Sequence, residues 1–369
     1  MNVLFLNWRD PAHPRAGGAE YLTHGIARRL VERGHRATWF AGAFRGGKPE
    51  VELDGVRIVR QGNAATVRFH AMHRYKALGD FDVVVDEINT LPFFAPLYAR
   101  KPVVALICQL AREVWFFEAP WPVAIAGYAC EPAYLQVYRR CPVLTISESS
   151  ARSIKHIGLR GEVDIMPMAI DQYAAEEPLP LAQRENAIAM VGRITASKRI
   201  DHVIKALATG ANGPLASMRL IVVGGGDERV KADLQRLAAS LGVAERIRWE
   251  GYAGEETKRR ILRTARAIVM TSAREGWGLV VSEANLAGTP AVVYDIPGTR
   301  DSVLDGITGI RCAPSPAALA AAIAELVADP VRYQTLSAAA QTFARTLTWD
   351  ATVDAAEAVL RREAARRTA

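Results

Sequence analysis

The chain has 369 residues, of which half are hydrophobic and 23% are charged, and its formal net charge is +7. This composition excludes a disordered protein, and the length exceeds the size at which one hydrophobic core usually stops growing, so two globular domains are predicted. The positive charge favours anionic ligands, but no basic run alternates with stacking aromatic residues, so we expect no nucleic-acid partner.

The first half alternates short apolar runs with segments of helical period. In Glu20–Arg33 the apolar residues share one face and Gly34 is placed to cap the C-terminus, which predicts a helix. The apolar runs are rich in valine and isoleucine without alternation, as is typical of strands buried on both faces of a parallel sheet. The expected strands are Asn2–Asn7, Arg36–Ala41, Val56–Arg60, Asp82–Val85, Val103–Ile107, Val143–Ile146 and Glu162–Met166.

The pattern restarts after a polar, proline-bearing stretch, Asp171–Asn186, which we expect to be a hinge. The alternation predicts an α/β fold with a doubly wound parallel sheet in each of two domains, residues 1–173 and 174–346. The sequence ends in two helical segments, and it leaves open whether a helix of about residues 347–369 packs back on the first domain. The second-half elements are expected at Ala187–Val191, Leu220–Val223, Ile247–Trp249, Ala267–Thr271 and Ala291–Tyr294 for strands, and at Pro330–Arg345 and Thr348–Arg362 for the last helices.

Glycine-rich and charged motifs follow several expected strands, where open parallel sheets collect their ligands. Gly17 and Gly18 open the first helix and let the backbone approach an anion, although a plain turn explains them almost as well. Gly192 and Arg193 end the first strand of the second half, and Lys198 follows five residues beyond Arg193. A glycine that clears space, an arginine fork and a flexible lysine are suited to grip a diphosphate, and the alternative is an ordinary turn.

A third motif, Gly224–Asp227, ends the strand Leu220–Val223 with three glycines and an aspartate. It lacks the GxGxxG spacing of a dinucleotide site. A helix-entry turn with Asp227 as its N-cap is therefore the expected role, and the glycines would let a ligand lie close to the backbone.

The fourth motif is Arg274–Pro290, with the sequence REGWGLVVSEANLAGTP. Glu275 is expected in a loop and Glu283 in the early part of a helix, with the N–H groups of Leu279 and Val280 between them facing phosphate oxygens. A carboxylate accepts paired hydrogen bonds from vicinal hydroxyls, so each acid is suited to one sugar ring of an elongated ligand. The alternative is a solvated helix residue and an ordinary loop acid.

Together these motifs resemble the retaining glycosyltransferases of the GT-B fold, family four (group 1) type. The resemblance covers nearly the whole chain in the right order, and the Glu-x7-Glu block is its most specific part. It implies two Rossmann-like domains facing a cleft. The N-terminal domain would bind the acceptor and the C-terminal domain a nucleotide-sugar donor.

The resemblance also implies residue roles. Arg193 and Lys198 would bind the donor diphosphate, Glu283 the ribose hydroxyls, and Glu275 the donor sugar. The implied catalytic residues are Glu275, Arg193, Lys198 and Cys108. The implied donor-binding residues are Gly17, Gly18, Gly192, Arg193, Lys198, Gly224, Gly225, Gly251, Tyr252, Glu275, Gly276, Trp277, Gly278, Leu279, Val280 and Glu283.

The chain departs from the family pattern at three places. Cys108 stands where the family often has a catalytically important histidine, and a thiol is a poor substitute for a neutral imidazole. Arg199 replaces the usual glycine after the lysine, and Met168-Ala169 replaces the usual Asn-Gly pair. The first departure bears on the efficiency of the reaction or the geometry of the sugar.

The resemblance implies a retaining hexosyltransferase that moves a sugar from an NDP-sugar, UDP first and GDP next, to a hydroxyl acceptor. The acceptor would be a glycan, a lipid-linked sugar or a small natural product such as an aminocyclitol, and neither a metal ion nor a cofactor is expected. The alternatives are a nucleotide-sugar epimerase of the same fold and a catalytically impaired nucleotide-sugar-binding protein. The oligomeric state is left open.

The cysteines show no CxxC pair and no zinc spacing with histidine, which favours reduced thiols in the cytoplasm. The aromatic stretch Arg112–Pro122, REVWFFEAPWP, has three alternative roles: an acceptor-binding wall, a contact with a membrane surface, or core packing around its prolines. We therefore expect a cytoplasmic protein, with peripheral contact at the inner membrane face as a variant of that location. The cysteines are Cys108, Cys130, Cys141 and Cys312.

Overall fold

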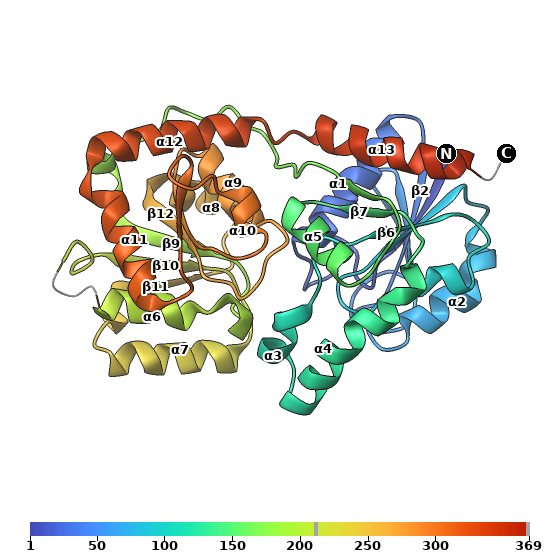
Figure 1. Ribbon diagram of the computed structural model, residues 1–369, viewed down its shortest axis with the longest axis horizontal. Helices are drawn as coiled ribbons and strands as arrows, with labels where there is room; N and C mark the ends of the chain where they lie inside the picture. Colours follow the sequence, from blue (N-terminus) through green and yellow to red (C-terminus); the bar gives the residue numbers. More distant parts are fainter. Residues whose placement is uncertain (210–212, 367–369) are drawn as a thin grey trace. The chain divides into compact units, whose positions relative to one another are not determined.

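The computed structural model describes residues 1–209 and 213–366. Its internal contacts divide the chain into two compact units. The first unit consists of Met1–Arg112, Ala126–Ala169 and the segment that begins at Thr348; the second consists of Glu113–Ile125 and Ile170–Leu347. The expected fold class, two Rossmann-like α/β domains, is confirmed (Figure 1).

The first unit is built on an eight-stranded sheet in the order β3-β4-β2-β1-β5-β6-β7-β8. Every neighbouring pair is parallel except β3 and β4. The strands are β1 (Asn2–Leu6), β2 (Arg36–Ala41), β3 (Glu50–Leu53), β4 (Val56–Arg60), β5 (Val83–Glu87), β6 (Val103–Leu106), β7 (Val143–Thr145) and β8 (Val163–Ile165). The helices are α1 (Gly18–Glu32), α2 (Val67–Leu78), α4 (Trp121–Leu135), which starts in the second unit, α5 (Glu148–His156) and α13 (Trp349–Ala365).

The second unit is built on a six-stranded parallel sheet in the order β11-β10-β9-β12-β13-β14. The strands are β9 (Glu185–Val191), β10 (Arg219–Val223), β11 (Ile247–Gly251), β12 (Ala265–Met270), β13 (Ala291–Tyr294) and β14 (Gly309–Cys312). The helices are α3 (Trp115–Glu118), α6 (Ile200–Thr209), α7 (Glu228–Ser240), α8 (Glu255–Thr264), α9 (Leu279–Leu286), α10 (Thr299–Ser302), α11 (Pro316–Ala328) and α12 (Pro330–Arg345).

The central strands of the second sheet, β9, β10, β12 and β13, are largely buried on both faces, as their apolar sequences predict. In β9, Ile188 and Met190 pack into a core with α6, α7 and α11, whereas Ala187 and Ala189 pack into a core with α8 and α9. Figure 1 shows the sheet between these two helix layers. Because both faces are covered, the edge at which the strands end is where a ligand meets the sheet.

Strand order reverses at one point in each sheet. In the first unit β1 lies between β2 and β5, and in the second unit β9 lies between β10 and β12. At such a point the loops after the two neighbouring strands run to opposite faces of the sheet. They therefore diverge, and a crevice opens at the carboxyl ends of the strands. The residues that follow β1 and β5, and those that follow β9 and β12, are therefore the first to inspect for function.

All strands expected from the sequence are present, with bounds within about two residues. Two further strands were not predicted. In β3 the sequence EVEL alternates with exposed charges at an antiparallel edge, and β14 contains a glycine and an arginine in a run of only four residues. Neither gives the unbroken apolar signal of a central parallel strand.

The C-terminal helix α13 packs on α1 within the first unit. Trp349 lies over Gly25, where an added Cβ would overlap the indole ring. Beside this contact the Glu357 carboxylate accepts hydrogen bonds from Arg33 (2.8 Å) and His35 (2.9 Å). The expected C-cap glycine of α1 is also confirmed, since Gly34 has a φ of 84° and its N–H donates to the carbonyl of Val31.

We expect the docking of α13 to depend on the charge of Glu357. Burial by itself would raise the pKa of Glu357, but hydrogen bonds from Arg33, His35 and Arg361 outweigh it and lower the pKa to about 2. A lowered carboxylate pKa stabilises the folded state above the unfolded pKa of about 4.3, and this contribution disappears as the pH falls toward 2. In urea unfolding, Glu357→Gln should be less stable than the wild type at pH 7, with the difference shrinking below about pH 4.5. An equal stability at pH 7 would contradict this assignment.

Candidate functional site

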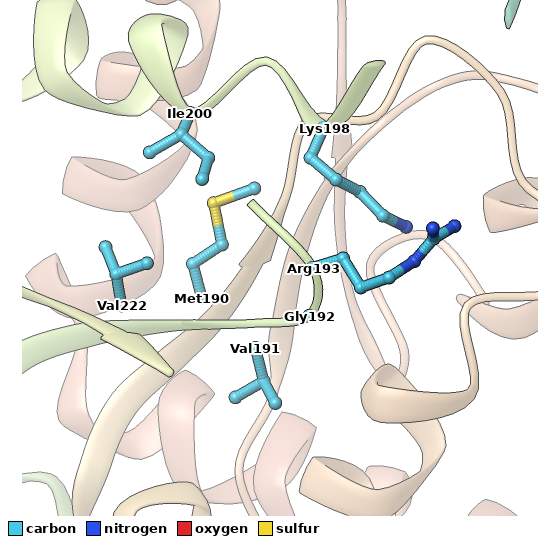
Figure 2. Close-up of a pocket in the computed structure, with 7 residues that line it drawn as sticks. All are labelled: Met190, Val191, Gly192, Arg193, Lys198, Ile200 and Val222. Atoms are coloured by element: carbon cyan, nitrogen blue, oxygen red, sulfur yellow. The ribbon is translucent and has the colours of Figure 1, made fainter. Parts of the chain in front are cut away.

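The residues that follow β9 form a small pocket in the second unit. Its lining includes Gly192, Arg193 and Lys198, together with apolar residues of β9, β10 and α6. Figure 2 shows the Arg193 and Lys198 side chains extending in the same direction, away from the apolar lining. No partner is found for the exposed Arg193 guanidinium among the side chains that the structure describes. Two cations thus reach the carboxyl end of the strand at which the order reverses.

The Lys198 ammonium forms an ion pair with Glu275, with 2.5 Å between Nζ and Oε1. The same carboxylate oxygen accepts a hydrogen bond from the Ser272 hydroxyl at 2.6 Å. Glu275 lies in the loop after β12, the strand that borders β9 at the reversal point. The structure therefore brings together two side chains that are separated by 77 residues in the sequence.

The two loops that carry Lys198 and Glu275 are joined by further hydrogen bonds. The Thr271 hydroxyl donates to the carbonyl of Lys198 (2.9 Å), and the Ala273 N–H donates to the carbonyl of Ser197 (2.8 Å). Arg199 has a left-handed φ of 51°. This conformation is easiest for glycine, which explains physically why a glycine is expected after the lysine.

Three strand ends of the second sheet meet closely at glycines. The N–H of Gly192 donates to Val223 (2.9 Å), and the N–H of Gly224 donates to Gly251 (2.7 Å). Gly224 has a φ of 130°, and an added Cβ would overlap the carbonyl oxygen of Gly192. Gly225 has open space at the same position. This close approach explains why the predicted donor-binding glycines come from three separate strands.

Two alanine substitutions test this packing. We expect Gly224→Ala to lower the free energy of unfolding by about 2 kcal/mol or more, because the backbone is strained for any other residue and the new methyl overlaps Gly192. Gly225→Ala, a change of the same size one residue away, should cost less than about 1 kcal/mol. Equal losses in chemical denaturation would show that the close approach is not required.

The predicted helix-entry turn is confirmed. Asp227 caps α7, and its carboxylate accepts hydrogen bonds from the backbone of Arg229 (2.8 Å) and Val230 (3.4 Å). The aspartate is thus used to hold the helix, and only the glycines before it are left to border a ligand.

Helix α9 begins as the sequence predicts, directly after Gly278, which has a φ of 95°. Glu275 lies in the preceding loop and Glu283 on the helix, so the two acids do not share a helix face. The N–H groups of Leu279 and Val280 lie in the first turn, where a helix leaves its N–H groups without intrahelical partners. Anions are favoured at this end of a helix.

Glu283 forms an ion pair with Lys258, at 3.1 and 3.2 Å from its two carboxylate oxygens. Burial raises the pKa of Glu283, and the charge of Lys258 opposes the rise. The predicted ribose-binding acid is therefore held in place by a lysine that the sequence analysis did not single out.

The remaining predicted residues of the second unit differ in exposure. Gly276 is buried, and Tyr252 is 92% exposed after β11. The Trp277 ring packs against a small apolar cluster, and its Nε1 donates to the Ser282 hydroxyl (2.9 Å). Trp277 thus anchors the loop that carries Glu275.

In the first unit, Gly17 and Gly18 open α1 beside a buried acid. The Glu20 carboxylate accepts a hydrogen bond from the Gly17 N–H (2.7 Å) and forms an ion pair with Arg9 (2.9 Å). This is the glutamate half of a capping box, since Gly17 has no side chain to return the bond, so the turn alternative explains the acid. This contact occupies the Gly17 N–H, and the anion-binding role of the two glycines stays a prediction.

A second buried acid, Glu87, was missed by the sequence analysis. It ends β5 at the reversal point of the first sheet and accepts hydrogen bonds from Thr23 (2.6 Å) and Asn89 (3.3 Å). Burial, followed by the charge of Glu20, raises the pKa of Glu87 to about 8. Asn7, directly after β1, is fully buried, and its Nδ2 has no hydrogen-bond partner among the described residues. The topological reversal is the signal that would have identified this cluster.

Cys108 follows β6, the next strand of the same sheet. Burial raises the pKa of the Cys108 thiol, and the nearby charges of Glu87 and Glu20 raise it further. A thiol in this setting keeps its proton at neutral pH, so it is unsuited to accept one. Its catalytic role remains a prediction.

Residues 171–343 match the sequence profile of a protein family described as "Glycosyl transferases group 1". This segment contains the pocket cations, the Glu275 loop and α9. This segment, slightly less than half of the chain, is similar to the group 1 glycosyltransferases. The resemblance inferred from the motifs is thereby confirmed.

Several curated relatives are glycosyltransferases by name. The D-inositol 3-phosphate glycosyltransferase of Thermomonospora curvata is 36% identical over 187 residues, which cover 49% of this chain and 43% of the relative. The enzyme of the same name from Rhodococcus opacus is 30% identical, with 58% and 51% covered. The chain thus matches about half the length of these relatives. An uncharacterized glycosyltransferase, MJ1607 of Methanocaldococcus jannaschii, is 26% identical with 89% and 90% covered.

Solved glycosyltransferases share the fold over nearly the whole chain. Sucrose-phosphate synthase from Thermosynechococcus elongatus has a TM-score of 0.82 at 19% identity, with 98% of each chain covered. Anabaena HepE, solved in complex with UDP-glucose, has a TM-score of 0.77 at 19% identity, with 97% and 99% covered. At this identity the likeness establishes the GT-B fold and not the substrate.

Three features of the described chain bear on the alternatives and expectations that the sequence raised. Of the aromatic stretch Arg112–Pro122, Trp121 is 67% exposed and Phe116 is 37% exposed, so core packing does not explain these two side chains. In the described ranges, 1–209 and 213–366, no helix is long and apolar enough to cross a membrane. Over the same ranges no three or more His, Cys, Asp or Glu side chains are grouped to hold a metal ion.

Proposed function

We propose that the chain is a retaining glycosyltransferase that moves a hexose from an NDP-sugar, UDP first and GDP next, to a hydroxyl acceptor. The proposal rests mainly on the second unit, where Arg193, Lys198 and Glu275 gather at the reversal point of a sheet in the segment that matches the group 1 family. A ligand with a diphosphate and a sugar matches that set of two cations and one carboxylate.

The donor diphosphate would bind Arg193 and Lys198. Its arrival gives Lys198 a second anion, so the ammonium would be shared between phosphate and Glu275, and Glu275 would turn its remaining oxygen to the sugar hydroxyls. Glu283, held by Lys258, would bind the ribose, with the first turn of α9 between the two acids.

The transfer step would proceed on one face of the sugar. The bond from the anomeric carbon to the diphosphate oxygen breaks, a bond from the same carbon to the acceptor oxygen forms, and the acceptor proton passes to the departing phosphate oxygen. Negative charge grows on the diphosphate as it leaves. Arg193 and Lys198 would stabilise that charge, which is the kind of electrostatic term that usually dominates catalysis. The residues in this scheme need neither a metal ion nor a cofactor.

The acceptor would bind at the first unit. Asn89, Cys108 and Gln109 are half-buried at its strand ends, with Glu87 and Asn7 beneath them. Neutral hydrogen-bonding groups of this kind are suited to hydroxyls. The names of the relatives make D-inositol 3-phosphate the first acceptor to assay. A glycan, a lipid-linked sugar and an aminocyclitol follow, and the lipid-linked sugar would also fit a cytoplasmic protein with peripheral contact at the inner membrane face.

A thermal-shift screen of NDP-sugars and their free nucleotides tests the donor assignment. A bound donor raises the melting temperature in proportion to the logarithm of its concentration over the dissociation constant. We expect UDP-sugars to give the largest shift and the diphosphate to shift more than the monophosphate. No shift with any nucleotide would remove the proposal. A shift without turnover would favour the catalytically impaired binding protein, and an epimerised donor would favour the epimerase.

A further inference from the structure

The segment Glu113–Ile125 packs within the second unit, although its neighbours in the sequence belong to the first. It contains the aromatic stretch and α3, for which the proposed function gives no role. Helix α3 contacts the 3-10 turn Ala196–Lys198, which carries one of the two pocket cations. We call Glu113–Ile125 the inserted segment.

Two carboxylates of the inserted segment bind the donor loops. The Glu118 carboxylate accepts a hydrogen bond of 2.5 Å from the hydroxyl of Ser197, which is buried. The Glu113 carboxylate pairs with Arg274 at 2.9 Å, and the Arg274 side chain is only 8% exposed. Charge-assisted hydrogen bonds of this kind are about twice as strong as neutral ones.

The two residues that these carboxylates bind lie next to the ion pair of the donor site. Ser197 immediately precedes Lys198, and Arg274 immediately precedes Glu275. Lys198 and Glu275 in turn form the 2.5 Å ion pair. Each carboxylate of the inserted segment thus binds the residue next to one member of the pair, and the contacts form a closed ring through the two loops.

Apart from the inserted segment, the Lys198 turn is held by hydrogen bonds from the Thr271 hydroxyl and the Ala273 N–H to its backbone carbonyls. These bonds fix the turn along the loop after β12 but leave the Ser197 hydroxyl with only Thr195 as a side-chain partner among the described residues. Glu118 adds a contact from outside both loops. The ammonium of a long lysine side chain is positioned more precisely when the backbone that carries it is held from more than one side.

We propose that Glu113 and Glu118 are positioning residues of the transferase: they fix the Lys198 and Glu275 loops at the spacing that the donor diphosphate and sugar require. This inference rests on the proposed function. It also gives the two acids of the REVWFFE sequence, Glu113 and Glu118, a functional role.

The inference predicts a loss that is specific to the diphosphate. Lys198 binds the part of UDP that UMP lacks, so a loosened Lys198 turn should weaken UDP and leave UMP nearly unchanged. General destabilisation would weaken both nucleotides alike. In calorimetric titrations with UDP, with GDP in parallel, and with the matching monophosphates, we expect Glu118→Ala to lower diphosphate affinity about tenfold and monophosphate affinity less than about twofold.

Three variants complete the experiment. Glu118→Gln retains an oxygen that accepts from Ser197, so it should recover most of the affinity. Ser197→Ala should resemble Glu118→Ala, and the double variant should be no worse than either one, because all three remove the same bond. Glu177→Ala removes an exposed carboxylate of the same unit for which no partner is found among the described residues, and it should behave as wild type.

The outcomes separate this inference from the proposed function. If the wild-type protein does not bind the nucleoside diphosphate more tightly than the monophosphate, the proposed diphosphate site is refuted, and the positioning role is refuted with it. If the wild-type protein prefers the diphosphate and Glu118→Ala keeps that preference, the donor site stands and the positioning role is refuted. Equal losses for both nucleotides, or losses that multiply in the double variant, would also refute it.

Discussion

Glu275→Ala should lower kcat by at least about 100-fold while the protein still folds. The Glu275 carboxylate receives both the Lys198 ammonium and the Ser272 hydroxyl, and its side chain is 13% exposed. Its loss removes the group that we assign to the donor sugar and leaves Lys198 without the anion that orients it. Lys198 is 26% exposed, so water can solvate the ammonium and the folded state should lose little stability.

The measurement is the rate of NDP release with a saturating donor and acceptor, together with the melting temperature. Asp233→Ala is the matched control, because it removes a carboxylate from an exposed ion pair with Arg236 in the same unit. The control should keep full activity. Glu275→Gln separates shape from charge, since the amide fits but cannot form the ion pair. Near-normal turnover of Glu275→Ala would remove this residue from the site.

Arg193→Ala should lower kcat/KM for the donor by about 100-fold, with effects on both KM and kcat. The guanidinium is exposed and meets no partner in the described part of the chain, so nothing in the fold depends on it. It is assigned to charge that grows on the departing diphosphate. An interaction that strengthens in the transition state lowers kcat when it is removed.

Steady-state kinetics with varied donor test this assignment. Arg193→Lys should recover only part of the loss, because an ammonium cannot form the paired hydrogen bonds of a guanidinium. Arg260→Ala, which removes another exposed arginine of the second unit, serves as the control and should leave kcat/KM unchanged. A rise in KM with unchanged kcat would mean that Arg193 binds donor and transition state equally and does not assist the chemical step.

The strand ends, turns and helix start of the second-unit candidate site could be predicted from the sequence because their signals are local. Gly192 and Arg193 follow β9 directly, and the Glu275 loop lies between β12 and α9. A strand end, a turn and a helix start can each be identified in a short window. The absence of an unbroken apolar run in β3 and β14 shows the limit of the same signals at sheet edges.

Long-range pairings could not be predicted in this way. The Thr23 and Glu87 side chains meet across 64 residues, and Ser197 and Glu118 meet across 79. Lys258 holds Glu283, yet its position on α8 resembles that of any surface lysine. Such contacts depend on how elements pack, which periodicity does not encode. The strand order of each sheet, once known, directs attention to Glu87 as clearly as to Glu275.

The central claim is transfer with retention from an NDP-sugar, and NMR of the anomeric proton tests it most directly. The assay combines wild-type protein, the donor selected by thermal shift, and the acceptor panel led by D-inositol 3-phosphate. We predict that the α-anomeric signal of the donor is replaced by an α-linked product signal, with one equivalent of NDP released and with dependence on the acceptor. A β-linked product, an epimerised donor, or an unchanged donor in the presence of every acceptor would contradict the account.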